Sequence, residues 1–165
     1  MKLDDATLRD LVDEKLPRAR VRAIQSAYKD PDRFDQYVAL LQARAAYDYP
    51  IVLPFGEHLN IVSKGGGSYV VKCDCGHEFC DYRANWKLEA LLRVRETEAE
   101  LREIFPEKMT GDGRWNHLRE FFCPGCMTLL EVDAAPPGYP ISHDFLPDLE
   151  GFYEEWLGRP LPGAA

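Results

Sequence analysis

The sequence contains no apolar run long enough to cross a membrane. A transmembrane helix needs about 20 consecutive apolar residues, and no stretch of this chain approaches that length. Residues 1–16, MKLDDATLRDLVDEKL, alternate charged and apolar side chains and lack the apolar segment of a secretion signal. We therefore expect a cytoplasmic protein without a membrane partner.

Basic residues are scarce relative to acidic ones. The chain has 20 lysine and arginine residues against 28 aspartate and glutamate residues, which gives a formal net charge of −8. A field of this sign repels phosphate backbones, and the sequence shows no clustered stripe of basic side chains. We therefore expect no nucleic-acid partner.

The common sequence motifs of catalysis are missing too. There is no GxxxxGK[ST] nucleotide loop, no HExxH metalloprotease motif and no GxSxG nucleophile motif. The histidines lie in different segments and are more typical of surface or packing residues than of catalysts: His58, His77, His117 and His143. The sequence therefore predicts neither a catalytic nor a cofactor-binding residue in this chain.

Five clustered cysteines are the most informative feature that is present. They are Cys73, Cys75, Cys80, Cys123 and Cys126. An odd number of cysteines without an export signal argues against a disulfide framework. In a reducing compartment, clustered cysteines are more often metal ligands, so we expect a metal site.

Hydrophobic periodicity predicts an α+β protein whose first segment, residues 1–49, is helical. Asp4 or Asp5 can cap a first helix, Pro17 suits the first turn of a second, and Asp30 and Pro31 begin a third. The apolar positions that recur at helical spacing are Leu8, Leu11 and Val12, then Val21, Ile24 and Tyr28, then Phe34, Tyr37, Val38 and Leu41.

Residues 50–133 change to short β-rich runs and predict a zinc-ribbon-like antiparallel β domain. The runs are residues 51–53, 58–62, 68–72, 88–95, 115–122 and 127–132. The glycines at 65–67 predict a hairpin turn between the second and third run. Thr97 and Glu100 form a capping box for an inserted helix at about residues 97–105.

Residues 134–165 predict a C-terminal arm and helix. The segment AAPPGYP at 134–140 is rich in proline, is not expected to fold alone and could lie on a partner. Asp148 can begin a closing helix that runs to about Leu157. Three tryptophans are expected to anchor the core, with a subunit interface as the alternative for some of them: Trp86, Trp115 and Trp156.

Two pairs of cysteines fit the hairpin knuckles of a zinc ribbon. Each pair follows a β-rich run and lies on a tight turn, so two such turns can enclose one tetrahedral ion. Cys123 and Cys126 bracket a Pro-Gly dipeptide, which suits a knuckle. In the first cluster Cys75 aligns with Cys126, because an apolar residue follows each of them four positions later, at Phe79 and Leu130. The upstream partner of Cys75 is then Cys73.

The predicted metal ligands are therefore Cys73, Cys75, Cys123 and Cys126. Cys80 remains the alternative to Cys73, and His77 a more distant one. Four thiolates leave no open position for water, so a zinc ion held by them would be structural. The competing interpretations are buried cysteines without a metal and a redox role for the CPGC segment. The redox role is disfavoured because the following residues, MTLLEV, indicate a strand and not a helix.

Around the cysteines the sequence resembles the gamma subunit of acetone carboxylase and, behind it, the small subunit of acetophenone carboxylase. The matching blocks are CDCGHEFCDYRANWK at 73–87, REFFCPGCMTLLEVDAAPPGYPISHDF at 119–145, PDLEGFYEEWLG at 147–158 and KDPDRFDQYVALLQAR at 29–44. The likeness covers most of the chain. One departure is Met127, where a glycine is common after the second cysteine of a knuckle.

The resemblance implies a small structural or assembly subunit of a biotin-independent, ATP-dependent ketone carboxylase, which joins acetone and bicarbonate to give acetoacetate. It implies larger alpha and beta subunits as partners in a hetero-oligomer. ATP and a catalytic divalent metal are expected in those partners, and a structural Zn²⁺ in this chain. The alternatives are a stand-alone zinc-ribbon protein-interaction module and a small enzyme whose catalytic zinc is bound by His77 in place of one cysteine.

Overall fold

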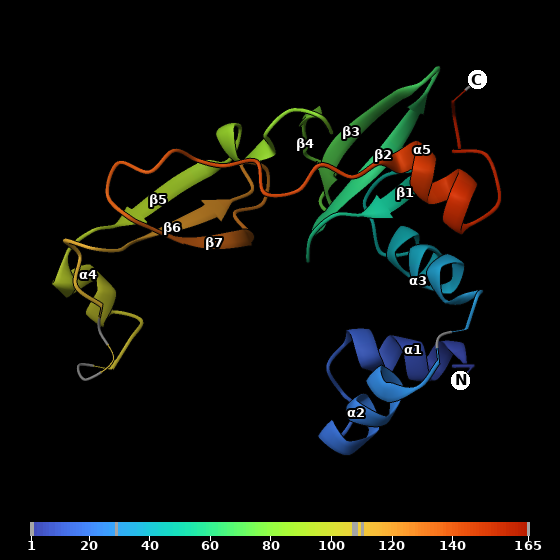
Figure 1. The fold of residues 1–165 in the computed structure, drawn as a ribbon, viewed down its shortest axis with the longest axis horizontal. Coiled ribbons are helices and arrows are strands. Elements are labelled where there is room, and N and C mark those ends of the chain that lie inside the picture. The colour runs from blue at the N-terminus through green and yellow to red at the C-terminus, as the bar shows by residue number, and fades with distance from the viewer. Residues whose placement is uncertain (1, 29, 107–108, 110, 165) are drawn as a thin grey trace. The chain divides into compact units, whose positions relative to one another are not determined.

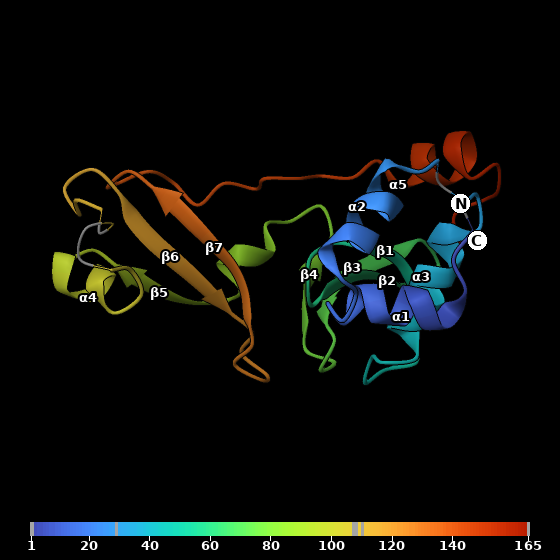
Figure 2. The same cartoon turned by 90° about the horizontal axis from the view of Figure 1, so that it is seen from below.

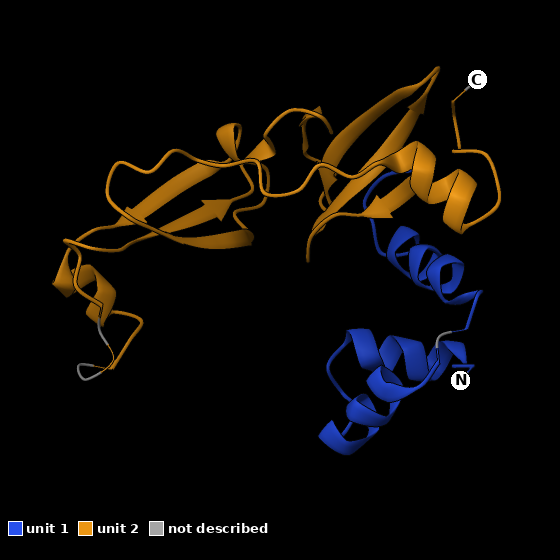
Figure 3. Ribbon diagram, viewed as in Figure 1, with its two compact units in different colours: residues 1–48 blue, residues 49–165 orange. Residues whose placement is uncertain are grey.

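The computed structural model describes residues 2–28, 30–106, 109 and 111–164. The chain divides into unit 1, Met1–Asp48, and unit 2, Tyr49–Ala165 (Figure 3). Unit 1 is built of helices, and unit 2 contains two antiparallel sheets with short helices. The α+β class expected from the sequence is therefore confirmed. No helix in the described ranges is long and apolar enough to pass through a bilayer.

The described residues of unit 1 form three helices: α1 (Asp5–Val12), α2 (Arg18–Ser26) and α3 (Arg33–Gln42). The carboxylate of Asp4 accepts the backbone N–H of Thr7 at 2.7 Å and so caps α1, as predicted. Pro17 stands at the N-cap of α2. A small core forms around three buried side chains: Leu3, Leu8 and Ile24. The prediction for Tyr28 was wrong, because α2 ends before it and its side chain is 91% exposed.

The first sheet of unit 2 contains four strands in sequence order: β1 (Ile51–Pro54), β2 (Leu59–Gly65), β3 (Ser68–Cys73) and β4 (Glu78–Asp81). The glycine turn between β2 and β3 is confirmed, since Gly65, Gly66 and Gly67 all have positive φ. The sequence did not predict β4. Its residues, EFCD, have a weak strand preference by themselves, and pairing with β3 at Val70 and Lys72 holds them in place.

The second sheet contains β5 (Leu91–Arg95), β6 (His117–Phe122) and β7 (Leu129–Ala135), with β6 in the centre (Figure 1). The strand expected from residue 88 begins later, because a 3₁₀ turn, η1 (Trp86–Leu88), precedes it. The side chain of Asn85 accepts the backbone N–H of Lys87 at 3.1 Å and fixes that turn.

The inserted helix α4 (Glu98–Arg102) begins with the predicted capping box. Thr97 Oγ1 accepts the N–H of Glu100 at 3.3 Å, and the Glu100 carboxylate accepts the N–H of Thr97 at 2.9 Å. The backbone hydrogen bond at Thr97 is the main reason that the pKa of Glu100 falls to about 2. The helix is shorter than predicted. Trp115, which follows in the same excursion from the sheet, is 76% exposed and does not anchor the core.

Trp86 does anchor the core of unit 2, as predicted, and is only 4% exposed. Its ring makes edge contacts with Phe79 of β4 and with Phe121 of β6, at centroid distances of 5.7 Å and 6.2 Å. Because the two phenylalanines belong to different sheets, the indole ring links the sheets through apolar contact.

The C-terminal arm leaves β7 and runs to α5 (Figure 1 and Figure 2). The guanidinium group of Arg119 in β6 donates to the carbonyl oxygens of Tyr139 and Pro140, and the side-chain amide of Asn85 donates to that of Ile141 at 3.1 Å. The arm is therefore fastened by polar side chains of its own unit.

The chain closes with α5 (Leu149–Gly151) and a π-helical turn, η3 (Phe152–Trp156). Asp148 caps this segment through the N–H of Gly151 at 2.9 Å, as predicted. Tyr153 is buried and donates its hydroxyl to the carbonyl of Val52 in β1 at 2.8 Å. Trp156 is 78% exposed, so its prediction as a core anchor was wrong. The wider π turn carries it away from the face that holds Tyr153.

Candidate metal centre

The first knuckle joins β3 to β4. The backbone N–H of Cys73 donates to the carbonyl of His77 at 2.9 Å, and the N–H of Gly76 donates to the carbonyl of Cys73 at 2.8 Å. Gly76 has φ of 96°, in the region that favours glycine. These two bonds fold the turn tightly and direct the thiols of Cys73 and Cys75 to one side.

The second knuckle joins β6 to β7 with the same kind of hydrogen bonding. The N–H of Cys123 donates to the carbonyl of Thr128 at 2.9 Å, and the N–H of Met127 donates to the carbonyl of Cys123 at 2.8 Å. Met127 has φ of 62°. It therefore adopts the left-handed conformation at the position where a glycine was expected, at a cost of about 1–2 kcal/mol.

The tips of the two knuckles approach each other closely at Gly125. A Cβ atom on Gly125 would lie 3.0 Å from Cβ of His77 and 3.3 Å from Sγ of Cys75. Both distances are shorter than ordinary van der Waals contact, so any larger side chain here would push the knuckles apart. The absence of a side chain at Gly125 thus allows the four thiols to meet.

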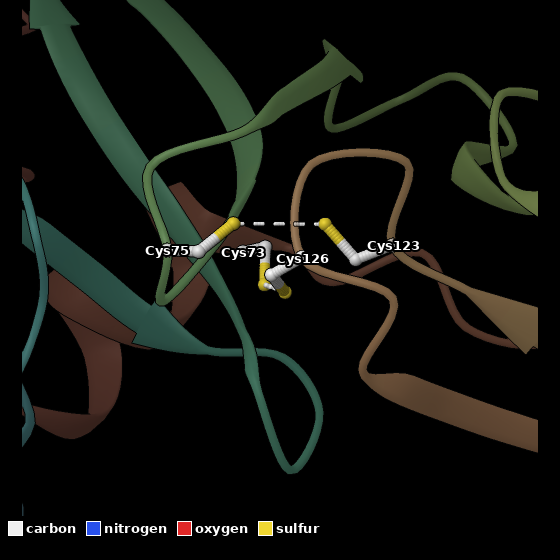
Figure 4. A group of neighbouring side chains, drawn as sticks. All are labelled: Cys73, Cys75, Cys123 and Cys126. Atoms are coloured by element: carbon white, nitrogen blue, oxygen red, sulfur yellow. Dashed lines mark hydrogen bonds between the residues drawn. The ribbon is translucent and has the colours of Figure 1, made fainter.

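The four sulfur atoms converge between the knuckles (Figure 4). Sγ of Cys73 lies 3.8 Å from Sγ of Cys126, and Sγ of Cys75 lies 3.7 Å from Sγ of Cys123. All four lie within 4.8 Å of one another. Zinc–sulfur bonds of about 2.3 Å place the sulfurs of a tetrahedral site about 3.8 Å apart. The spacing fits a four-sulfur zinc site and is far longer than the bond of about 2.05 Å in a disulfide.

Burial divides the four thiols into two pairs. Cys73 and Cys123 are buried, whereas Cys75 and Cys126 are exposed. Desolvation raises the pKa of the buried Cys73 thiol, and it also raises that of the Cys75 thiol, whose sulfur faces the other cysteines although the residue is exposed. Cys126 differs, because hydrogen bonds from the side chain and backbone of Thr128 lower its pKa to about 6. Thr128 Oγ1 lies 3.1 Å from the sulfur, so its hydroxyl can donate to the thiolate.

The side chains of the two alternative ligands, Cys80 and His77, make other contacts. Sγ of Cys80 is 3.7 Å from the carbonyl of Ala84, and Cys80 does not belong to the group of four thiols found among the described residues. The ring of His77 packs edge-on against Phe79 at a centroid distance of 4.9 Å. The geometry thus favours Cys73 over both Cys80 and His77 as the fourth ligand.

A second group of potential ligands was missed by sequence reasoning and consists of the carboxylates of Glu131, Asp133 and Asp144. The ammonium group of Lys87 lies among them and pairs with all three, at 2.7 Å from Glu131 and 3.0 Å from Asp133. Burial lowers the pKa of Lys87, but the three carboxylates outweigh it and the net shift is upward. The positive charge of the lysine thus neutralises these carboxylates as a cation would. Its ion pairs connect η1 with β7 and with the arm.

Comparison with known proteins decides the family. A family model described as the acetone carboxylase gamma subunit matches residues 45–157, which include both knuckles.

This chain belongs to the acetone carboxylase gamma subunit family.

The acetone carboxylase gamma subunit of Xanthobacter autotrophicus is 48% identical over 157 residues, which are 94% of each chain. The acetophenone carboxylase beta subunit of Aromatoleum aromaticum is 31% identical over 83 residues, which are 47% of this chain and 61% of that protein. The resemblance drawn from the cysteine blocks is therefore confirmed.

Proposed function

We propose that this chain is a small structural subunit of a ketone carboxylase complex and that a zinc ion bound by its four converging cysteines holds it together. In this proposal the complex joins acetone and bicarbonate to give acetoacetate in an ATP-dependent, biotin-independent reaction in the cytoplasm. Larger alpha and beta subunits bind the ATP and a catalytic divalent metal. The tetrahedral spacing of the four sulfurs, in a chain of the gamma subunit family, carries the proposal.

The proposed ligands are Cys73, Cys75, Cys123 and Cys126. A zinc ion with four protein sulfurs supplies a cross-link and leaves no position for a reactive water. The two knuckles are far apart in the sequence and belong to different sheets. Binding both of them to one ion restricts the relative motion of the sheets, which is a structural role.

Large apolar side chains on the surface support a role in assembly. Trp115, Met109 and Trp156 are each more than 70% exposed. Tryptophan is enriched at protein interfaces, where its wide apolar surface is removed from water. The relative from Xanthobacter is named a gamma subunit, and this name supports the proposal that the present chain also has partner chains.

The metal part of the proposal is tested with the purified full chain and two matched variants. We expect about one zinc per chain by elemental mass spectrometry in the wild type and in Cys80→Ser. Cys73→Ser is expected to lose zinc, because a three-thiolate site binds it far more weakly. Zinc lost from Cys80→Ser and retained by Cys73→Ser would contradict the proposed ligand set.

The assembly part is tested by purifying a tagged chain from its native host grown on a ketone. We expect two larger subunits to be recovered with it in fixed ratio, together with ATP-dependent carboxylation of acetone. Cys73→Ser is expected to reduce recovery of the complex, whereas Cys80→Ser is not. A wild-type chain recovered alone would contradict this function and favour a stand-alone zinc-ribbon interaction module.

A further inference from the structure

The two exposed sulfurs of the candidate metal centre have different surroundings. Cys75 and Cys126 occupy equivalent places in their knuckles, and each sulfur accepts a hydrogen bond from the backbone two residues later, at His77 and Thr128. Cys126 additionally has the hydroxyl of Thr128, with Oγ1 at 3.1 Å from its sulfur.

The residue equivalent to Thr128 in the first knuckle is engaged elsewhere. The imidazole of His77 packs edge-on against Phe79, and the tip of the second knuckle at Gly125 lies against its Cβ atom. The first knuckle therefore supplies a side chain for packing at this position. The second knuckle supplies a hydrogen-bond donor that points at a ligand.

A donor at Cys126 has a definite chemical consequence. Hydrogen bonds to a thiolate spread its negative charge, orient its lone pairs and lower its tendency to react with protons or electrophiles. Because Cys126 is exposed, water and small reagents can reach its sulfur, whereas Cys73 and Cys123 are shielded by burial. The donor thus stands beside a ligand that solvent can attack.

We propose that Thr128 is a positioning residue of the metal centre, whose hydroxyl donates to the Cys126 thiolate and slows the release of the bound metal. The proposal rests on the zinc site proposed above and adds a residue outside the four ligands. It concerns the donor atom of Thr128 and not its bulk. It therefore requires that a serine can replace this threonine and that a valine of the same shape cannot.

The test uses the full chain loaded with Zn²⁺, or with Co²⁺ as a spectroscopic substitute. Release of zinc to a chromogenic chelator and the sulfur-to-cobalt charge-transfer bands are measured for wild type, Thr128→Val and Thr128→Ser. We expect Thr128→Val to release zinc about tenfold faster, at the lower end of the effect of losing an outer hydrogen-bond partner, and to shift the cobalt bands. Thr128→Ser is expected to match the wild type.

Thr97→Val is the matched control, because it removes a hydroxyl from the cap of α4 in the same unit. It is expected to lower stability and to leave the zinc release rate and the cobalt spectrum unchanged. If Thr128→Val does not fold, Thr128→Ala gives the same comparison, since it also lacks the donor.

The outcomes separate this inference from the function on which it rests. Equal release rates for wild type and Thr128→Val, or equally fast release from Thr128→Ser and Thr128→Val, would overturn the role of the hydroxyl while the zinc site stands. A wild-type chain that binds neither Zn²⁺ nor Co²⁺ would overturn the zinc site itself.

Discussion

The two knuckles of unit 2 each bring two cysteine sulfurs to the candidate metal centre, but their sequences differ. The first places one residue between its cysteines, Cys73 and Cys75, and the second places two between Cys123 and Cys126. Both close with a bond from the first cysteine's N–H to the carbonyl two residues beyond the second cysteine. The position of the sulfurs is therefore set by the strands that enter and leave the turn, and the number of residues between the cysteines can vary.

The knuckles differ more in the residue that adopts the left-handed backbone conformation of the turn. The first uses Gly76 in the left-handed region without penalty, and the second uses Met127 there. The second knuckle also has a glycine at its tip, Gly125, and a donor, Thr128, beside its exposed sulfur. The two knuckles therefore share a geometry but reach it with different residues, and four measurements test this comparison.

The largest effect is expected from removing the aromatic link behind both knuckles. Trp86→Ala deletes a buried indole that contacts Phe79 on the side of the first knuckle and Phe121 on the side of the second. We expect the free energy of unfolding to fall by about 3–5 kcal/mol, as for other buried tryptophans. Chemical denaturation of the zinc-loaded chain measures this.

Trp115→Ala serves as the control, since that side chain is exposed. We expect it to change the free energy of unfolding by less than about 0.5 kcal/mol. Equal losses for Trp86→Ala and Trp115→Ala would show that the indole ring of Trp86 does not connect the two sheets.

The second prediction compares the exposed thiols of the two knuckles in the metal-free chain. Hydrogen bonds from Thr128 lower the pKa of Cys126 to about 6, whereas desolvation raises that of Cys75. At pH 7 Cys126 is therefore mainly a thiolate, and Cys75 mainly a thiol. Alkylation mapped by mass spectrometry is expected to modify Cys126 first, with an advantage on the order of 100-fold in thiolate fraction.

The sign of the pH dependence follows from the lowered pKa. As the pH falls through about 6, Cys126 takes up a proton and its own rate of alkylation declines, whereas above pH 6 its rate levels off while that of Cys75 is still rising. Circular dichroism verifies that the metal-free chain is folded during the measurement. Parallel pH profiles for Cys75 and Cys126 would refute the difference between the two knuckles.

The third prediction concerns the contact between the knuckle tips. Gly125→Ala would place a methyl group 3.0 Å from Cβ of His77 and 3.3 Å from Sγ of Cys75. We expect a loss of about 1–3 kcal/mol in the free energy of unfolding, as for overpacking in a close contact, and weaker zinc binding. Gly111→Ala is the control, because a Cβ atom there meets nothing within 4 Å. Unchanged zinc affinity in Gly125→Ala would mean that the tips can separate without loss.

The smallest effect is a gain in stability from making the second knuckle more like the first. Met127→Gly removes the left-handed strain of a non-glycine residue. The greater freedom of glycine in the unfolded chain offsets part of the gain, so we expect up to about 1 kcal/mol of stabilisation. A thermal melt of the zinc-loaded chain measures it. A lower melting temperature would indicate that the side chain of Met127 contributes contacts that outweigh the strain.

Local signals in the sequence predicted those features that depend on neighbouring residues. The cap at Asp4, the box formed by Thr97 and Glu100 and the turn at Gly65–Gly67 all involve residues within a few positions of each other. Their hydrogen bonds or backbone angles follow from residue type, so they could be predicted before the fold was known.

Features that depend on distant contacts were not predictable in the same way. Lys87 carries no local signal for its pairing with Glu131 and Asp144, because their distance in sequence hides the contact. The tryptophans show the same limit, since all three are large and apolar but only Trp86 is buried. Residue type indicates the energy available from burial, while the path of the chain decides which side chain is buried.

The sequence by itself determined the family and the α+β class. It also nominated four cysteines as ligands, with Cys80 left as the alternative to Cys73, since paired cysteines before β-rich segments indicate knuckles whatever the rest of the chain does. Only the tertiary structure decided that Cys73 and not Cys80 faces Cys126, that Gly125 lets the knuckles touch and that Thr128 reaches a sulfur. The first two are contacts between the knuckles, whose distances depend on how two sheets pack. The third lies within the second knuckle and depends on the backbone path of that turn and on the side-chain rotamers.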